Sequence, residues 1–63
     1  MNKLKETREA RGLSQGQLAK QAGVDVRSIQ AYEQGLRDLS KASVKTVIAL
    51  AKVLGVTAED LVE

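Results

Sequence analysis

The chain of 63 residues contains no cysteine, no histidine and no proline. Without thiols or imidazoles it has no disulfide frame and lacks the common soft metal ligands. It also lacks the residues that most often serve as enzymatic nucleophile and general base. Tyr32 is the only aromatic residue, so the stacking platforms of single-stranded nucleic-acid binders are missing. We therefore expect no metal, no cofactor, no small-molecule substrate and no enzymatic activity.

Long hydrophobic runs are absent as well. No stretch approaches the roughly 20 apolar residues of a membrane span, and the first residues, Met-Asn-Lys-Leu-Lys-Glu, lack the apolar core of a signal peptide. A chain of this length buries only about 60% of the surface that its unfolded form exposes, which leaves little room for a catalytic cleft. We expect a single domain over residues 1–63, without membrane contact, in the reducing cytoplasm.

The charge is unevenly distributed along the chain. The net charge is +2, but three of the eight acids, Glu59, Asp60 and Glu63, lie in the final five residues. Residues 1–56 therefore hold all ten basic residues against five acids, a net charge of +5. This excess suits a polyanionic partner, and a solvated surface of mixed charge explains it equally well.

Glycines divide the chain into five predicted helices. Gly12, Gly23, Gly35 and Gly55 each follow a helix-like run and are suited to the left-handed conformation that ends a helix. The helices are expected over about 2–11, over 14–22 with residue 14 as the cap, over 26–34, over about 44–54, and from 57 to the end of the chain.

Polar residues mark where four of these helices begin. Ser14 and Gln17 have the spacing of a capping box, in which each side chain bonds to the other residue's backbone N–H. Asp25 and Ser43 precede the third and fourth helices as N-caps, and Thr57 begins the last, with an acid three positions on.

Apolar residues recur at helical spacing, and no run alternates with the period of a strand. The pattern predicts an all-α fold whose core includes Leu4, Leu18, Ala19, Ile29, Val47, Leu50, Ala51 and Leu54.

The predicted helix over 26–34 has two chemically different faces. At ~100° per residue, placing Ile29 inward points Arg27, Ala31 and Gln34 nearly outward, with Gln30 at the flank. A planar cation, amides and a methyl group suit the base edges of the DNA major groove. An ordinary solvated helix face has the same residue types, so this pattern alone leaves both interpretations open.

A longer pattern favours the first interpretation. Gln-Leu-Ala-Lys-Gln-Ala-Gly-Val from Gln17 to Val24, then Ser28-Ile29 and Tyr32-Glu33-Gln34-Gly35, resembles the helix-turn-helix family of phage repressors and Cro proteins, called the XRE type. The family's opening pattern is matched by Leu4, Arg8, Arg11, Gly12, Leu13, Ser14 and Gln15, and its closing pattern by Leu50, Ala51, Leu54, Gly55, Val56 and Leu61. The resemblance implies a compact five-helix, lambda-repressor-like domain in which helices two and three form the helix-turn-helix.

The resemblance also assigns roles to individual positions. Residues that face bases or the nearby backbone in the family correspond here to Val26, Arg27, Ser28, Gln30 and Ala31. Phosphate contacts correspond to Gln15, Gln34, Arg37, Lys41 and Ser43; for Gln15 a role limited to the capping turn is the alternative, and the phosphate contact is favoured. Arg8 and Glu33 occupy positions that form a structural salt bridge in relatives. The family's frequent proline before helix four is replaced by Ala42, which makes the path of the preceding loop harder to predict.

These roles imply a sequence-specific binder of double-stranded DNA that acts as a transcriptional regulator, expected to be a repressor. We expect an inverted-repeat operator and a homodimer through the region of helices four and five, weak because the chain stops at Glu63, unless a dimerising part lies elsewhere. The alternative is a protein-interaction module, such as an antitoxin or an antirepressor partner, with the same fold. In that alternative the third helix is a docking surface for a protein. Replacement of Arg27 by Ala discriminates between the two, because unchanged affinity for every DNA sequence in a random pool would exclude groove reading.

Overall fold

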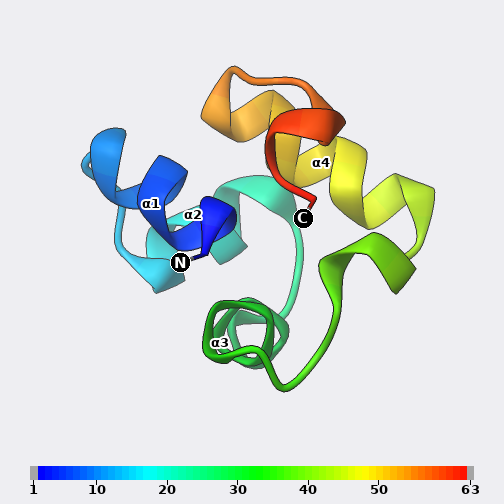
Figure 1. Ribbon diagram of the computed structural model, residues 1–63. Coiled ribbons are helices and arrows are strands. Elements are labelled where there is room, and N and C mark those ends of the chain that lie inside the picture. Colours follow the sequence, from blue (N-terminus) through cyan, green and yellow to red (C-terminus); the bar gives the residue numbers. More distant parts are fainter. Residues whose placement is uncertain (1, 63) are drawn as a thin grey trace.

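The computed structural model describes residues 2–62 and folds them entirely into helices and connecting turns, with no strand in that range (Figure 1). The α-helices are α1 (Lys3–Ala10), α2 (Gln15–Ala22), α3 (Val26–Gln34) and α4 (Val44–Leu54). Two short 3-10 helices follow α3 and α4, namely η1 (Leu39–Lys41) and η2 (Ala58–Asp60). The all-α prediction is confirmed.

The polar residues expected at the helix starts do cap them. Ser14 Oγ accepts from the backbone N–H of Gln17 at 3.0 Å, and the Gln17 side-chain oxygen accepts from the backbone N–H of Ser14 at 2.8 Å. The Asp25 side chain caps α3 by accepting from the backbone N–H of Arg27, and the Ser43 side chain caps α4 by accepting from the backbone N–H of Thr46. Each cap satisfies a backbone donor that the helix itself leaves unpaired, so the predicted starts of α2, α3 and α4 are confirmed.

Two predicted helices are longer than those observed. The first was expected over about 2–11, but Asn2 is an extended cap whose side chain accepts from Lys5, and Arg11 closes the other end. The expected fifth helix is only the 3-10 turn η2. There the backbone N–H groups of Asp60 and Leu61 bond three residues back, while the Asp60 carboxylate is held by Thr57. This closed capping box stabilises a tight turn rather than an α-helix.

The core lies between the four α-helices. Helix α2 packs against both α3 and α4, and α1 packs against α3. All eight apolar residues predicted for the core are buried, and Leu18, Ile29, Leu50 and Leu54 are completely so. The core also contains Tyr32, Leu61 and Leu39. Leu39 lies in a segment expected to be a loop, and the η1 turn brings it inward. No helix within residues 2–62 has both the length and the apolar character of a membrane span.

The turn between α2 and α3 sets the direction of α3. Gly23 has φ 69° and ψ 32°, in the left-handed region, and the backbone N–H of Val24 returns to the carbonyl of Ala19 at 3.0 Å. These features end α2 abruptly, and Asp25, two residues after Gly23, caps the start of α3. The two helices are thus joined by a turn of three residues, and α3 forms the lower edge of the molecule in Figure 1.

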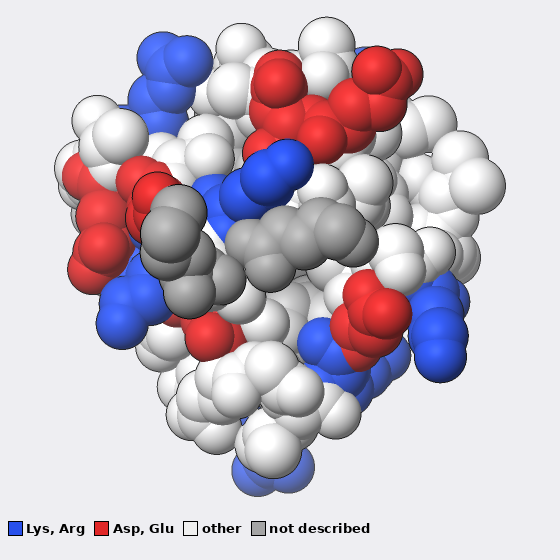
Figure 2. Space-filling model, viewed as in Figure 1, with Lys and Arg blue, Asp and Glu red and all other residues white. Residues whose placement is uncertain are grey.

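On the face seen in Figure 2, acidic side chains lie mainly away from α3. In Figure 2 they gather at the left, where α1 lies, and at the upper right, near the end of the chain. The exposed acids of these elements are Glu6 and Glu9 in α1 and Glu59 and Asp60 in η2. A smaller acidic group lies at the lower right of the same view, beside basic atoms, and the lowest part of the view shows white and basic atoms.

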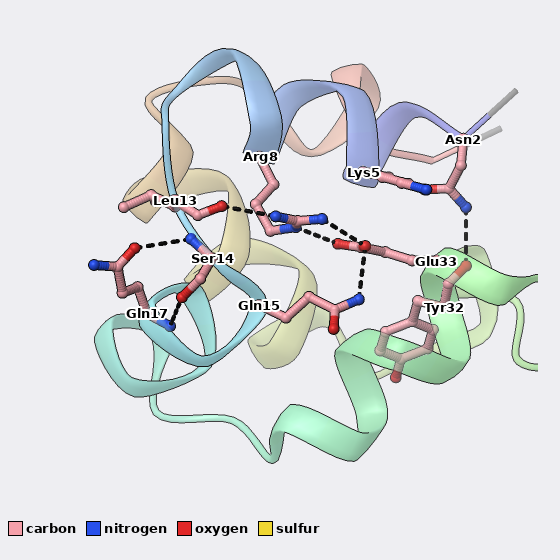
Figure 3. Close-up of polar contacts among 9 residues, drawn as sticks. All are labelled: Asn2, Lys5, Arg8, Leu13, Ser14, Gln15, Gln17, Tyr32 and Glu33. Atoms are coloured by element: carbon pink, nitrogen blue, oxygen red, sulfur yellow. Dashed lines mark hydrogen bonds and ion pairs between the residues drawn. The ribbon is translucent and has the colours of Figure 1, made fainter.

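The Glu33 carboxylate joins α3 to the other two N-terminal helices (Figure 3). Arg8 Nε donates to Glu33 Oε2 at 2.7 Å, and Arg8 Nη2 donates to Oε1 at 3.0 Å. Gln15 Nε2 also donates to Oε1, at 3.0 Å. The remaining Arg8 nitrogen, Nη1, donates to the backbone carbonyl of Leu13 at 2.7 Å. Only 2% of the Glu33 side chain and 10% of the Arg8 side chain are exposed.

This network determines the charge state of both partners. Burial of the Glu33 carboxyl by itself raises its pKa, but the hydrogen bonds from Arg8 and Gln15 and the nearby positive charges outweigh burial, so the pKa lies below its ordinary value of 4.5. The hydrogen bond with Glu33 raises the pKa of Arg8 in turn. The pair is therefore ionised at neutral pH, and each charge is hydrogen-bonded within the protein.

Replacing Gly23 by Ala should destabilise the domain by about 1 to 2 kcal/mol, because an L side chain is strained in the left-handed region. No atom lies within 4 Å of the added Cβ, so the cost measures backbone strain alone. Gly16→Ala is the matched control, since Gly16 is helical and its Cβ would meet only Ser14 Oγ at 3.9 Å. Urea unfolding should show Gly16→Ala to be neutral or stabilising; equal losses in both variants would contradict the interpretation.

Acid should destabilise the protein through Glu33. Because the folded pKa of Glu33 is lower than its unfolded value, its contribution to the free energy of unfolding is complete above about pH 4.5 and is lost as the pH falls through the folded pKa. Glu33→Gln should lose about 3 to 5 kcal/mol at pH 7, because Arg8 keeps a buried charge without a counter-charge. Its stability should then fall less steeply than that of the wild type below pH 4.5.

Urea unfolding at a series of pH values checks this expectation. Glu9→Gln is the control, because it removes an exposed carboxylate next to Arg8 in α1, outside the buried network. It should keep the acid sensitivity of the wild type. If Glu33→Gln loses stability in acid as steeply as the wild type does, another group is responsible for the effect.

Candidate nucleic-acid interface

Helix α3 has one buried side and one accessible side. Ile29 and Tyr32 are buried in the core, whereas Arg27, Gln30 and Gln34 are exposed. Val26, Ser28 and Ala31 are half-buried. This division follows the orientation expected from helical periodicity with Ile29 inward. The long polar side chains of α3 are thus free to enter a groove as wide as the major groove of DNA.

The five residues expected to face bases occupy the first two turns of α3. The helix begins at Val26, immediately after the Asp25 cap, whose carboxylate accepts from the backbone N–H of Arg27 at 2.8 Å. The cap fixes the backbone of this turn, from which the Arg27 guanidinium extends into solvent. Arg27 and Gln30 combine a fork of charged donors with an amide, which suits guanine and adenine edges.

Gln15 lies in the first turn of α2, at the helix end that attracts anions. It was expected to bind a phosphate, and the structure gives its amide nitrogen a partner inside the protein, Glu33 Oε1. An amide has two N–H donors and a carbonyl oxygen, so this bond leaves the other donor for a further partner. The bond with Glu33 was not predicted, because nothing in the spacing of the two residues indicates it.

The other expected phosphate contacts lie at the end of α3 and in the segment that follows. Gln34 is exposed in the last turn of α3, and Lys41 is exposed at the end of η1. Ser43 Oγ accepts from the backbone N–H of Thr46 at 3.1 Å and donates to Thr46 Oγ1 at 2.9 Å. Its hydroxyl thus caps α4, while the start of that helix carries the partial positive charge of unpaired N–H groups.

Arg37 differs most from what was expected. It was assigned to the backbone of DNA, and the structure places it against α3. Its Nη1 donates to Ser28 Oγ at 3.0 Å, and its guanidinium carbon lies 4.9 Å from the centre of the Tyr32 ring. The structure therefore places Arg37, which was expected to contact a phosphate, against Ser28, which was expected to contact a base. The hydrogen bond between Arg37 and Ser28 could not be predicted from the sequence, because the two residues are nine positions apart with the end of α3 and a turn between them.

Asp38 moderates the positive charge of the same segment. Hydrogen bonds from Ser40, through its hydroxyl at 2.7 Å and its backbone N–H at 2.9 Å, lower the pKa of the Asp38 carboxyl. The acid therefore stays ionised between the cations Arg37 and Lys41. Its role is structural in the first place, because it caps the η1 turn that buries Leu39.

Comparisons with known proteins agree with this geometry. A helix-turn-helix family model matches residues 4–61. The solved structure of SinR, the master regulator for biofilm formation, in complex with DNA, is similar with a TM-score of 0.81 and 27% identity over 89% of this chain and 86% of that chain. The restriction-modification controller protein C.AhdI from Aeromonas hydrophila is similar with a TM-score of 0.80 and 33% identity over 92% and 83% of the two chains.

A search of curated protein sequences found no match. The family match nevertheless spans nearly the whole chain, and the two structures named above are those of a master regulator and a controller protein. The match includes the capped helices α2 and α3 and the turn at Gly23. From this turn, the accessible outer side of α3 and the family match together, we conclude that the chain belongs to the XRE-type helix-turn-helix family of DNA-binding transcriptional regulators.

Proposed function

We propose that this protein binds a specific double-stranded DNA sequence with α3 in the major groove and acts as a repressor in the cytoplasm. One observation carries the proposal: the outer side of α3 exposes Arg27, Gln30 and Gln34, while its inner side is fixed in the core. A rigid helix that presents long donors holds the geometry that base reading requires. The similarity to SinR, which was solved in complex with DNA, supports the same mode of binding.

Specificity and positioning are assigned to different residues in this proposal. Val26, Arg27, Ser28, Gln30 and Ala31 face the bases and their immediate backbone. Gln15, Gln34, Arg37, Lys41 and Ser43 lie toward the phosphates and fix the register of α3 in the groove. Arg8 and Glu33 do not contact DNA and hold α1 and α3 together.

Two copies are proposed to bind an inverted repeat. A single module buries about 600 to 1,000 Å² on DNA, which is small for tight binding, and two-fold partners place half-sites about 34 Å apart. Exposed apolar residues on α4 support a contact between copies, because Val44 is 73% exposed and Ile48 is 43% exposed. These residues are one helical turn apart, so they share a face. Two apolar side chains offer only a small contact area, so the proposed dimer is weak.

Arg27→Ala should weaken binding to the preferred sequence by about 1 to 3 kcal/mol and reduce discrimination at one base pair. Lys52→Ala is the control for loss of one positive charge, since Lys52 lies in the last turn of α4, at the end far from Ser43. Duplexes selected from a random library by the wild type, followed by titration of both variants, provide the measurement. If Arg27→Ala leaves affinity for every sequence unchanged, the fold serves as a protein-interaction module instead.

Ile48→Glu should dissociate the dimer without unfolding the monomer, because the side chain is already partly in solvent and a charge at a two-fold contact meets its own copy. We expect a loss of about tenfold or more in affinity for the full inverted repeat and little change for a single half-site. Sizing of the complex and titration with both duplexes check this. Equal losses on both duplexes would show that α4 does not mediate pairing.

A further inference from the structure

The chain turns back on α3 immediately after that helix ends. The backbone N–H groups of Leu36 and Arg37 both bond to the carbonyl of Ala31, at 2.9 and 3.2 Å. This turn carries the Arg37 side chain along α3 toward its start. Its guanidinium there bonds to Ser28 Oγ and lies over the Tyr32 ring.

The guanidinium covers one flank of the outer side of α3. Ser28 and Tyr32 are one turn apart, so they line the same strip of the helix. At ~100° per residue, Ser28 lies about 60° from Ala31, on the side of the helix opposite Gln30. The outer face is therefore bordered by the Gln30 amide on one side and by Ser28 with Arg37 on the other. Arg37 is exposed and Ser28 is half-buried.

The bond with Arg37 restricts what Ser28 can recognise. A serine hydroxyl has one donor and two acceptor sites, and by itself it can serve either kind of base atom. A guanidinium only donates, so Ser28 Oγ accepts from Arg37 and keeps its O–H as a donor for another partner. The nearby cation also repels a second donor such as the amine of a base. Ser28 next to Arg37 therefore favours a hydrogen-bond acceptor.

We propose that Ser28 and Arg37 act as a single base-selecting pair, in which Arg37 positions Ser28 as a donor. The pair favours guanine, whose two major-groove atoms both accept, and disfavours cytosine, which presents an amine donor. This inference rests on the proposed function, because it requires α3 to lie in the major groove. It changes the assignment of Arg37 from a phosphate contact to a positioning residue for sequence choice.

The first test needs no DNA. The face of the Tyr32 ring shifts nearby protons to high field, so the side-chain NMR signals of Arg37 should be displaced relative to those of the exposed Arg11. Ser28→Ala should reduce this displacement, because the guanidinium loses its hydrogen-bond partner. Signals of Arg37 that coincide with those of Arg11 in the wild type would overturn the proposal.

The second test uses duplexes that differ at each position of the selected binding site. Ser28→Ala, Arg37→Met and the double variant should each reduce the discrimination against cytosine at one and the same base pair. The ratio of affinities for guanine and cytosine at that position should fall by about three- to tenfold, the size expected for one hydrogen bond. The double variant should lose no more than either single variant, because the two residues act together. Met keeps the apolar stem of Arg37 and removes all its donors.

Lys41→Met is the matched control, a cation removed from the same segment. It should weaken binding to all sequences alike and reduce the salt dependence of log affinity by about 0.9. If Arg37→Met behaves in this way, or if its effect adds to that of Ser28→Ala, Arg37 is a phosphate contact and the proposal is wrong. A wild type without any sequence preference would refute the proposed function itself, and this inference with it.

Discussion

The arrangement of the N-terminal helices depends on one buried carboxylate. Glu33 receives hydrogen bonds from Arg8 of α1 and Gln15 of α2 while it belongs to α3. Arg8 reaches the carbonyl of Leu13 as well, so the connection between α1 and α2 is fixed by the same group. The desolvation of the two charges is costly, and only a full set of partners offsets it. The ion pair therefore specifies one orientation of α3 more than it adds to stability.

Much of the fold could be predicted because its signals are local. Ser14, Asp25 and Ser43 begin helices through bonds to residues two or three positions on, and Gly23 ends one through its own backbone angle. The periodic apolar residues indicated the core correctly for the same reason. Where the local signal was ambiguous, the prediction failed: Thr57 and Asp60 have a capping spacing that serves a 3-10 turn as well as an α-helix.

The parts that could not be predicted depend on contacts across the fold. Leu39 becomes a core residue because the η1 turn, capped by Asp38, directs it inward. Arg37 reaches Ser28 because the chain reverses over α3, and Asn2 Nδ2 donates to the carbonyl of Tyr32 at 2.9 Å across 30 residues. No periodicity or spacing in the sequence indicates such pairs. The family pattern named Gln15, Ser28 and Arg37 one by one, and only the structure showed which side chains they contact.

The bond between Gln15 and Glu33 has a thermodynamic consequence for any anion that approaches the start of α2. A glutamine side chain without a partner in the protein loses rotational freedom when it binds a ligand. Here that freedom is already lost when the domain folds, since the amide is held half-buried against the acid. Loss of side-chain entropy is thereby transferred from the binding step to the folding step, and the ligand meets a group whose orientation is set in advance.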